Sequence, residues 1–278
     1  MSNFAFVFPG QGSQKIGMLA ELADQNPIIE KTFSEASEVL GYDMWQLIQQ
    51  GAQEDINLTQ RTQPILLTCS VAIWRLWNQK QGAKPSQMAG HSLGEWSALV
   101  CANVIDFADG LKMVEARGKF MQQAVPVGQG AMAAIIGLDD KAILAACTEA
   151  STLGVVDAVN FNAPGQVVIA GANDAVERAM DICKAAGAKR ALPLPVSAPF
   201  HTSLMKPAAD NLAEMVNTIT FRAPEVPVMH NVHAKNEHDP QAIKALMLEQ
   251  IYSPVKWVDC VEQLKDSGVS ALVECGPG

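Results

Sequence analysis

The segment Gly90-His91-Ser92-Leu93-Gly94 constrains the fold of this chain more than any other stretch. Residues 86–90 have the length of a short strand, and residues 93–101 carry helix-forming residues with apolar positions at helical spacing. A strand, a sharp turn and a helix form a nucleophile elbow, in which glycines flank an exposed serine because side chains would crowd the turn. The pattern predicts covalent acyl chemistry on Ser92. The alternative is a serine that only caps a helix after a glycine turn.

The composition is that of an ordinary globular protein. The chain has 278 residues, of which 49% are hydrophobic and 18% charged, so it can bury one large core or two modest ones. The formal net charge of -9 argues against nucleic-acid binding, which normally requires a basic face.

The cysteines and the hydropathy pattern indicate where the protein resides. Six cysteines lie mostly in apolar segments without C-x-x-C spacing, which is typical of buried thiols in a reducing compartment. The N-terminal apolar run lacks a basic region and ends at Pro9, so we interpret it as a strand and not a signal peptide. No apolar run approaches the ~18 residues of a membrane span. We expect a cytoplasmic protein without membrane contact.

The order of apolar patterns predicts an α/β fold. Residues 4–8 form a compact apolar run that is typical of a central strand in a parallel sheet. Helices are expected over residues 32–40, 43–50, 60–79, 106–124, 203–216, 240–250 and 257–266, and further strands over residues 226–230 and 271–274.

Between two proline-rich connectors, a separate pattern predicts an inserted unit. It gives the order β-α-β-β-α-β, with elements at residues 131–136, 139–149, 155–161, 166–170, 174–186 and 190–196. We therefore predict an α/β-hydrolase-like large domain with a parallel sheet, formed by residues 1–126 and 199–278. A ferredoxin-like small domain, residues 127–198, is inserted into it, and the interface between them is the favoured place for a ligand.

A serine nucleophile needs a base, and His201 is the favoured histidine. It lies in a loop where the chain leaves the predicted small domain, although a histidine that caps a helix or is merely exposed remains the alternative. His91 is adjacent to Ser92 but points differently on the turn. His230 and His233 form an H-x-x-H pair, yet no glutamate or cysteine cluster completes a metal site, so we expect no metal.

Arg117 lies on the wrong face of its predicted helix. At roughly 100° per residue it falls in the apolar arc, where an unpaired guanidinium would cost several kcal/mol. It therefore needs an anion. The partner is either a protein carboxylate or a substrate carboxylate, whose geometry matches the guanidinium fork; a third possibility is that the side chain reaches the surface.

Gln11 follows the first predicted strand between two glycines. Residues 10–15 do not match a dinucleotide-binding pattern, because Lys15 replaces the third glycine. A backbone N–H at Gln11 would instead suit an oxyanion hole, together with the N–H of Leu93, the residue after the nucleophile.

Five ordered motifs together resemble a known family. They are F-P-G-Q-G-S-Q at residues 8–14, G-H-S-L-G-E at 90–95, V-E-A-R-G at 114–118, N-x-N-A-P-G-Q at 160–166 and S-A-P-F-H at 197–201. The chain is similar along essentially its whole length to bacterial malonyl-CoA:acyl-carrier-protein transacylases.

The resemblance implies a malonyl transfer through a malonyl-serine on Ser92, with His201 as base and Arg117 binding the malonyl carboxylate. Gln11 and Leu93 would form the oxyanion hole. It further implies that a main-chain carbonyl at Gln250 orients the histidine, that Asn162 lines the cleft, and that Phe200 disfavours an α-methyl branch. The implied partners are malonyl-CoA and acyl carrier protein in fatty acid synthesis, without a cofactor, since the substrates carry the phosphopantetheine.

Two other functions remain as alternatives. A serine esterase or thioesterase shares the elbow, but its usual order places an acidic residue between the serine and the histidine. Five aspartates between them lie in the inserted unit, at positions 139, 140, 157, 174 and 181. A non-catalytic module that binds carrier protein is the other alternative. Family members usually continue for another strand and helix, so we expect a truncated C-terminus.

Overall fold

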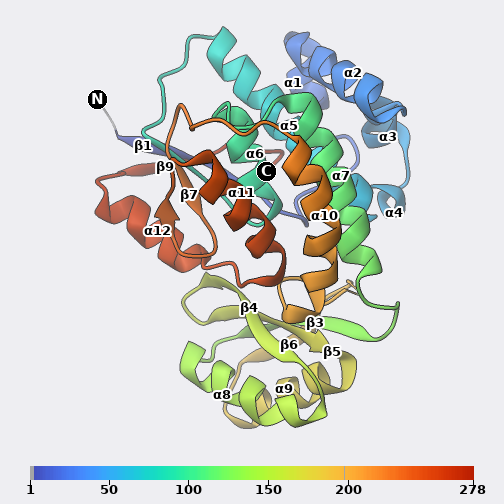
Figure 1. Cartoon of the computed structure of the whole chain (residues 1–278), viewed down its shortest axis with the longest axis vertical. Helices are drawn as coiled ribbons and strands as arrows, with labels where there is room; N and C mark the ends of the chain where they lie inside the picture. Colours follow the sequence, from blue (N-terminus) through green and yellow to red (C-terminus); the bar gives the residue numbers. More distant parts are fainter. Residues whose placement is uncertain (1–2, 197) are drawn as a thin grey trace.

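Figure 1 shows the computed structural model, which describes residues 3–196 and 198–278. Ser197, the first residue of the S-A-P-F-H motif, lies outside the described residues, as do Met1 and Ser2. No described helix combines the length and hydropathy that crossing a bilayer requires. All six cysteines are buried free thiols, as the sequence predicts.

Two sheets organise the chain (Figure 1). The first has the strand order β8-β7-β2-β1-β9, and its members are β1 Phe4–Phe8, β2 Gln87–Gly90, β7 Val228–His230, β8 Lys235–Asn236 and β9 Ala271–Glu274. All neighbours pair in parallel except β8, which is antiparallel to β7. This confirms an α/β fold with a parallel sheet.

The second sheet is antiparallel, with the order β4-β5-β3-β6. Its strands are β3 Gly130–Ile136, β4 Val156–Ala163, β5 Gln166–Ala172 and β6 Arg190–Pro193. Helices α8 Asp140–Ala150 and α9 Asn173–Ala185 follow β3 and β5, which confirms the predicted β-α-β-β-α-β order. Figure 1 shows this unit at the lower end of the molecule, with α8 and α9 on the outer face of its sheet.

The remaining helices surround the first sheet. They are α1 Ala20–Gln25, α2 Ile28–Leu40, α3 Met44–Gln50, α4 Gln53–Ile56, α5 Thr59–Gln79, α6 Leu93–Cys101, α7 Phe107–Gln123, α10 Lys206–Thr218, α11 Pro240–Glu249 and α12 Trp257–Asp266. Short 3-10 turns lie at η1 Ser151–Leu153, η2 Ser203–Met205 and η3 Gln250–Tyr252.

Alternation along β1 separates two apolar layers. Phe4, Phe6 and Phe8 of β1 join the main core with α5, α6 and α7, whereas Ala5 faces the opposite layer, formed with α12. The same period operates in β3, where Ile135 packs with α8 and α9 but Met132 joins the main core. The antiparallel sheet thus buries one face against its own helices and contributes the other to the rest of the molecule.

Backbone hydrogen bonds fix β4 against the segment before α12. Phe161 N–H donates to Val255 O at 3.1 Å, and Val255 N–H donates to Val159 O at 2.7 Å. β4 belongs to the antiparallel sheet, whereas Val255 precedes α12 in the part of the chain that carries the parallel sheet. The pairing therefore holds β4 beside the parallel sheet.

The sequence prediction erred on a few short elements. Residues 190–196 do not form one strand, because β6 ends at Pro193 and proline cannot donate to a ladder. The helix expected over residues 203–216 begins as η2, since Pro207 has no N–H to bond the carbonyl four residues before it. The elements α1, α4 and β8 were not predicted, because they offer too few positions for a periodic pattern.

The nucleophile turn yields a stability prediction. A Cβ on Gly90 would lie 1.9 Å from the carbonyl carbon of Gly94, so Gly90→Ala forces β2 and α6 apart. We expect Gly90→Ala to lower the free energy of unfolding by about 3 kcal/mol or more in urea titrations. Gly128→Ala is the matched control, because its Cβ meets nothing within 4 Å but its φ is +85°. It should cost about 1–2 kcal/mol, and equal losses in both variants would contradict the packing argument.

Candidate functional site

Ser92 lies on a strained turn between β2 and α6. Its φ of 52° and ψ of -103° place a non-glycine residue outside the common backbone regions. Asn231 stabilises this turn, because its Oδ1 accepts a hydrogen bond from Ser92 N–H at 2.8 Å and its Nδ2 donates to Gly90 O at 2.8 Å. The strained backbone presents the hydroxyl at the end of the strand, as a nucleophile elbow requires.

The structure brings His201 to Ser92, although the two are 109 positions apart in the chain. His201 Nε2 lies 2.8 Å from Ser92 Oγ, and its Nδ1 lies 2.9 Å from the carbonyl oxygen of Gln250. A carbonyl only accepts, so Nδ1 carries the proton and Nε2 accepts from the serine hydroxyl. The main-chain carbonyl of Gln250 therefore selects the tautomer in which His201 can remove the serine proton.

Burial keeps this histidine in its neutral form. Loss of solvent, with the nearby positive charge of Arg117, lowers the pKa of His201 to about 3. Near pH 7 the ring is unprotonated at Nε2 and is ready to act as a base. Binding of an anion to Arg117 would offset that positive charge and raise the pKa of His201 towards its ordinary value.

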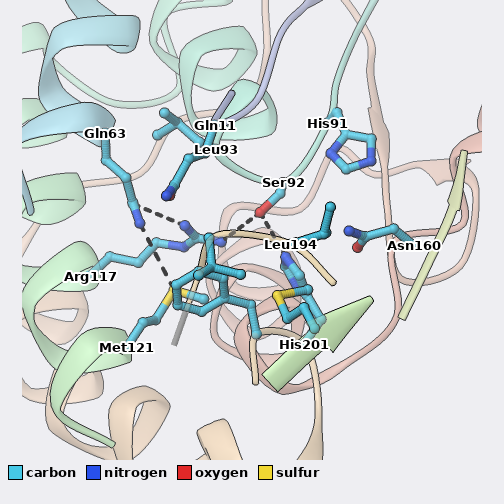
Figure 2. A pocket seen from close by; sticks show the side chains of 13 residues that line it. Gln11, Gln63, His91, Ser92, Leu93, Arg117, Met121, Asn160, Leu194 and His201 are labelled. Atoms are coloured by element: carbon cyan, nitrogen blue, oxygen red, sulfur yellow. Dashed lines mark hydrogen bonds between the residues drawn. The ribbon is translucent and has the colours of Figure 1, made fainter. Parts of the chain in front are cut away.

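Arg117 on α7 is buried and directed at the nucleophile (Figure 2). Its Nη2 donates to Ser92 Oγ at 3.1 Å and to Gln250 Oε1 at 3.0 Å, and its Nη1 donates to Gln63 Oε1 at 2.9 Å. Its Nε has no partner in the described part of the chain. Burial lowers the pKa of Arg117 to about 10, so the side chain remains a cation near neutral pH.

The close packing of α7 against α5 determines how deeply the Arg117 guanidinium is buried. A Cβ on Gly118 would lie 2.6 Å from the carbonyl oxygen of Thr59, so α7 approaches the start of α5 at the residue after Arg117. Gln63, one turn further along α5, is thereby within reach of the guanidinium. The predicted inward position of Arg117 is confirmed.

A small cavity opens in front of Ser92. Its volume is about 130 Å³, well below the ~300 Å³ of sites for drug-sized ligands, so it suits a short group. Figure 2 shows Gln11, Leu93 and Arg117 around the hydroxyl on one side and His91 and Asn160 on the other. Leu93 is the first residue of α6, so its N–H has no acceptor within the helix and is available to an oxyanion.

Phe200 lines the same cavity, but Asn162 does not. The Asn162 side chain instead accepts a hydrogen bond from His91 Nε2 at 2.8 Å, and Asn160, two residues earlier on β4, forms the wall. Asn162 therefore contacts a residue of the cavity wall, His91, and its expected place in the cleft stays a prediction. Since β4 contains register shifts here, simple alternation along the strand does not predict which asparagine faces the cavity. His91 Nε2 is used in this bond and does not face Ser92 Oγ.

Gln63, Asn231 and Glu95 are buried polar residues of the site that were not singled out from the sequence. Gln63 contacts Arg117, Asn231 holds the turn, and Glu95 lies on α6 directly behind the elbow. The sequence does carry a signal for Glu95, because a carboxylate within the apolar run of a buried helix is unusual. His230 of the H-x-x-H pair donates from Nδ1 to Glu95 Oε1 at 2.7 Å.

Comparison with known proteins identifies close relatives. A family model described as an acyl transferase domain matches residues 5–277. The malonyl CoA-acyl carrier protein transacylase of Escherichia coli (strain K12) is 62% identical over 278 residues, covering 100% of this chain and 90% of that protein. A crystal structure of an acyl carrier protein S-malonyltransferase from Vibrio cholerae matches with a TM-score of 0.98 and 61% identity, covering 100% of this chain and 90% of that one. A malonyl-transacylase in complex with its type II PKS acyl-carrier protein has a TM-score of 0.98, 59% identity and the same coverage.

The buried His201 yields a prediction about stability and pH. Its pKa in the folded protein, about 3, lies below the ~6.5 of an unfolded chain, so only the unfolded state gains a proton as the pH falls through 6.5. Stability attributable to His201 is therefore present above about pH 6.5 and declines below it. Between about pH 7.5 and pH 5, wild type should lose about 2 kcal/mol more unfolding free energy than His201→Gln in urea titrations. Parallel pH profiles would contradict this assignment.

Proposed function

Since the chain belongs to the bacterial malonyl-CoA:acyl-carrier-protein transacylases of the acyl transferase family, we propose that it transfers malonyl from malonyl-CoA to the phosphopantetheine thiol of acyl carrier protein. The single observation that carries this proposal is the contact of 3.1 Å between Arg117 Nη2 and Ser92 Oγ. A buried cation beside a nucleophilic serine fits an acyl group that carries its own anion. Malonyl transfer of this kind supplies fatty acid synthesis.

In the first half-reaction, His201 Nε2 takes the proton of Ser92 as Oγ attacks the thioester carbonyl. In this proposal the backbone N–H groups of Leu93 and Gln11 stabilise the oxyanion of the tetrahedral intermediate. When the intermediate collapses, the carbon–sulfur bond breaks and the coenzyme A thiolate takes the proton from His201. Malonyl is then an ester on Ser92.

The second half-reaction runs the same steps in reverse with a different thiol. The phosphopantetheine thiol of the carrier gives its proton to His201 and attacks the ester carbonyl, and Ser92 recovers its proton when the malonyl group leaves. Both thiols approach through the same cavity, and the substrates themselves carry the phosphopantetheine. The proposed reaction therefore uses no cofactor.

Arg117 accounts for the choice of acyl group. The malonyl carboxylate would replace Ser92 Oγ on the edge of the guanidinium formed by Nη1 and Nη2, where two parallel hydrogen bonds suit a carboxylate. An acetyl group offers no anion to this buried cation, so its transition state loses that stabilisation. The ring of Phe200 borders the same space and would crowd an α-methyl branch.

A serine thioesterase is the second candidate, because the elbow alone does not distinguish it. The orientation of His201 argues for the transferase: its Nδ1 faces a carbonyl instead of the carboxylate of a hydrolase triad. Asp106, an acidic residue between Ser92 and His201 that lies outside the inserted unit, pairs with Arg222 at 2.9 Å and does not orient the ring. The third candidate is a module that only binds carrier protein.

The proposed site lies between two structural units of the chain. We assign residues 1–126 and 199–278 to an α/β-hydrolase-like catalytic domain and residues 127–198 to a ferredoxin-like small domain. The separate apolar cluster formed by residues 133–183 supports this division. A cytoplasmic location agrees with the six buried free thiols and with the proposed substrates.

Intact-protein mass spectrometry tests the proposed reaction. After mixing with malonyl-CoA, wild type should gain one malonyl group on Ser92, because the ester persists until a thiol accepts the malonyl group. Addition of holo carrier protein should then remove it. Ser92→Ala is the matched control and should gain none. Rapid turnover to free malonate without carrier would support the thioesterase, and binding without an adduct would support the module; either result rejects the proposal.

Removal of Arg117 should change the choice of acyl group. Arg117→Ala loses the carboxylate contact, so we expect kcat/KM for malonyl-CoA to fall by at least about 100-fold, equivalent to roughly 3 kcal/mol. The rate with acetyl-CoA should fall much less, so the malonyl-to-acetyl ratio decreases. Steady-state transfer to carrier protein measures both rates. If the two rates decrease by the same factor, Arg117 does not recognise the carboxylate.

A further inference from the structure

Glu95 is a buried charge that the proposed reaction does not use. Among residues 3–196 and 198–278, it is the only aspartate or glutamate in the buried set, and Arg117 is the only lysine or arginine there. A buried cation and a buried anion each need compensation, because transferring an isolated charge out of water costs several kcal/mol. Their common burial suggests that each compensates the other.

The side-chain amide of Gln250 stands between the two charges. Its Nε2 donates to Glu95 Oε2 at 2.7 Å and to the carbonyl oxygen of Ser92 at 2.9 Å, so both N–H groups are committed. Its Oε1 consequently faces Arg117 Nη2 at 3.0 Å. The Glu95 carboxylate thus interacts with the Arg117 guanidinium through the intervening amide of Gln250. It does not itself occupy the N–H groups of the guanidinium.

Both carboxylate oxygens of Glu95 are hydrogen-bonded within the protein. Besides Gln250, Oε2 accepts from Asn231 N–H at 3.1 Å and Oε1 accepts from His230 Nδ1 at 2.7 Å. Nε2 of His230 is buried and has no partner in the described part of the chain. Arg117 is the lysine or arginine that is buried with Glu95, and the carboxylate raises the pKa of Arg117 against the lowering caused by burial.

We propose that Glu95 is the resident counter-ion of Arg117 and that Gln250 holds the pair apart, so that the empty site is neutral while the guanidinium remains open to a substrate carboxylate. Glu95 is a positioning residue that acts through Gln250. The negative charge of Glu95 also repels the incoming substrate carboxylate. It thereby limits how tightly Arg117 holds the malonyl carboxylate, which must leave with the carrier after each turnover.

This inference rests on the proposed function for the identity of the acyl group. A direct ion pair between Glu95 and Arg117 would block the carboxylate, and no counter-ion at all would hold it too firmly. Glu95, separated from Arg117 by the Gln250 amide, neither blocks the substrate carboxylate nor leaves it bound too firmly. Free substrate analogues and stability measurements can test the charge pair without any transfer reaction.

The first test is binding of monomethyl malonate, which carries one carboxylate and one ester carbonyl. Glu95→Gln removes the charge and keeps an oxygen for Gln250 and Asn231. Removing the repulsive charge should tighten binding roughly tenfold in isothermal titration calorimetry. With malonyl-CoA, KM should fall and kcat should fall with it, because release of the malonyl product slows.

Two control variants separate charge from general loosening. His230→Asn disturbs the same buried cluster without removing a charge, so it should lower Tm but bind monomethyl malonate with the affinity of wild type. Arg117→Gln should abolish binding. Wild-type or weaker affinity in Glu95→Gln would overturn the proposal, and so would equal tightening in His230→Asn.

A double-mutant cycle in unfolding free energy covers the case in which Glu95→Gln folds poorly. The double variant Glu95→Gln/Arg117→Gln removes both buried charges and should be more stable than Glu95→Gln alone, because no unpaired cation remains. If the double variant is no more stable than the single one, Glu95 has a structural role only. A wild type that forms no malonyl adduct on Ser92 would reject the proposed function and leave this cycle interpretable.

Discussion

The contact between the Arg117 guanidinium and the Ser92 hydroxyl is the interaction on which the rest of the site depends. A buried arginine must be surrounded by acceptors, and the chain supplies them from three distant segments: Gln63 on α5, Ser92 at the elbow and Gln250 in η3. The close approach of α7 to α5 at Gly118 makes this depth possible. Burial lowers the pKa of His201 and the positive charge of Arg117 adds to that effect, so in the proposed reaction one side chain influences both the base and the choice of acyl group.

Two strained residues carry the proposed chemistry, and the surrounding structure holds them in place. Ser92 and His201 both have positive φ values, 52° and 66°, which side chains other than glycine rarely adopt. Asn231 bonds the backbone on both sides of the elbow, and Gln250 uses its side chain for the elbow and its main-chain carbonyl for His201. A single residue therefore couples the orientation of the base to that of the nucleophile.

Much of this architecture could be predicted from the sequence, because long periodic segments and glycine-bounded motifs carry strong local signals. The elbow, the order of the inserted unit and the inward position of Arg117 follow from spacing alone. The partners of Arg117 could not be predicted in the same way, since Gln63 and Gln250 come from separate helical segments whose packing decides the contact. Asn162 shows the same limit on a smaller scale, because it lies on a strand with register shifts and contacts His91 of the cavity wall.

In the proposed reaction, Ser92 carries malonyl while Arg117 binds its free carboxylate. A crystal structure of the protein trapped as the malonyl-serine, prepared with malonyl-CoA in the absence of a thiol acceptor, tests this directly. We expect an ester on Ser92 Oγ, a carboxylate bound by both terminal nitrogens of Arg117, and the ester carbonyl oxygen directed at the backbone N–H groups of Gln11 and Leu93. A malonyl group whose carboxylate points to solvent, with Arg117 still bound only to protein acceptors, would contradict it.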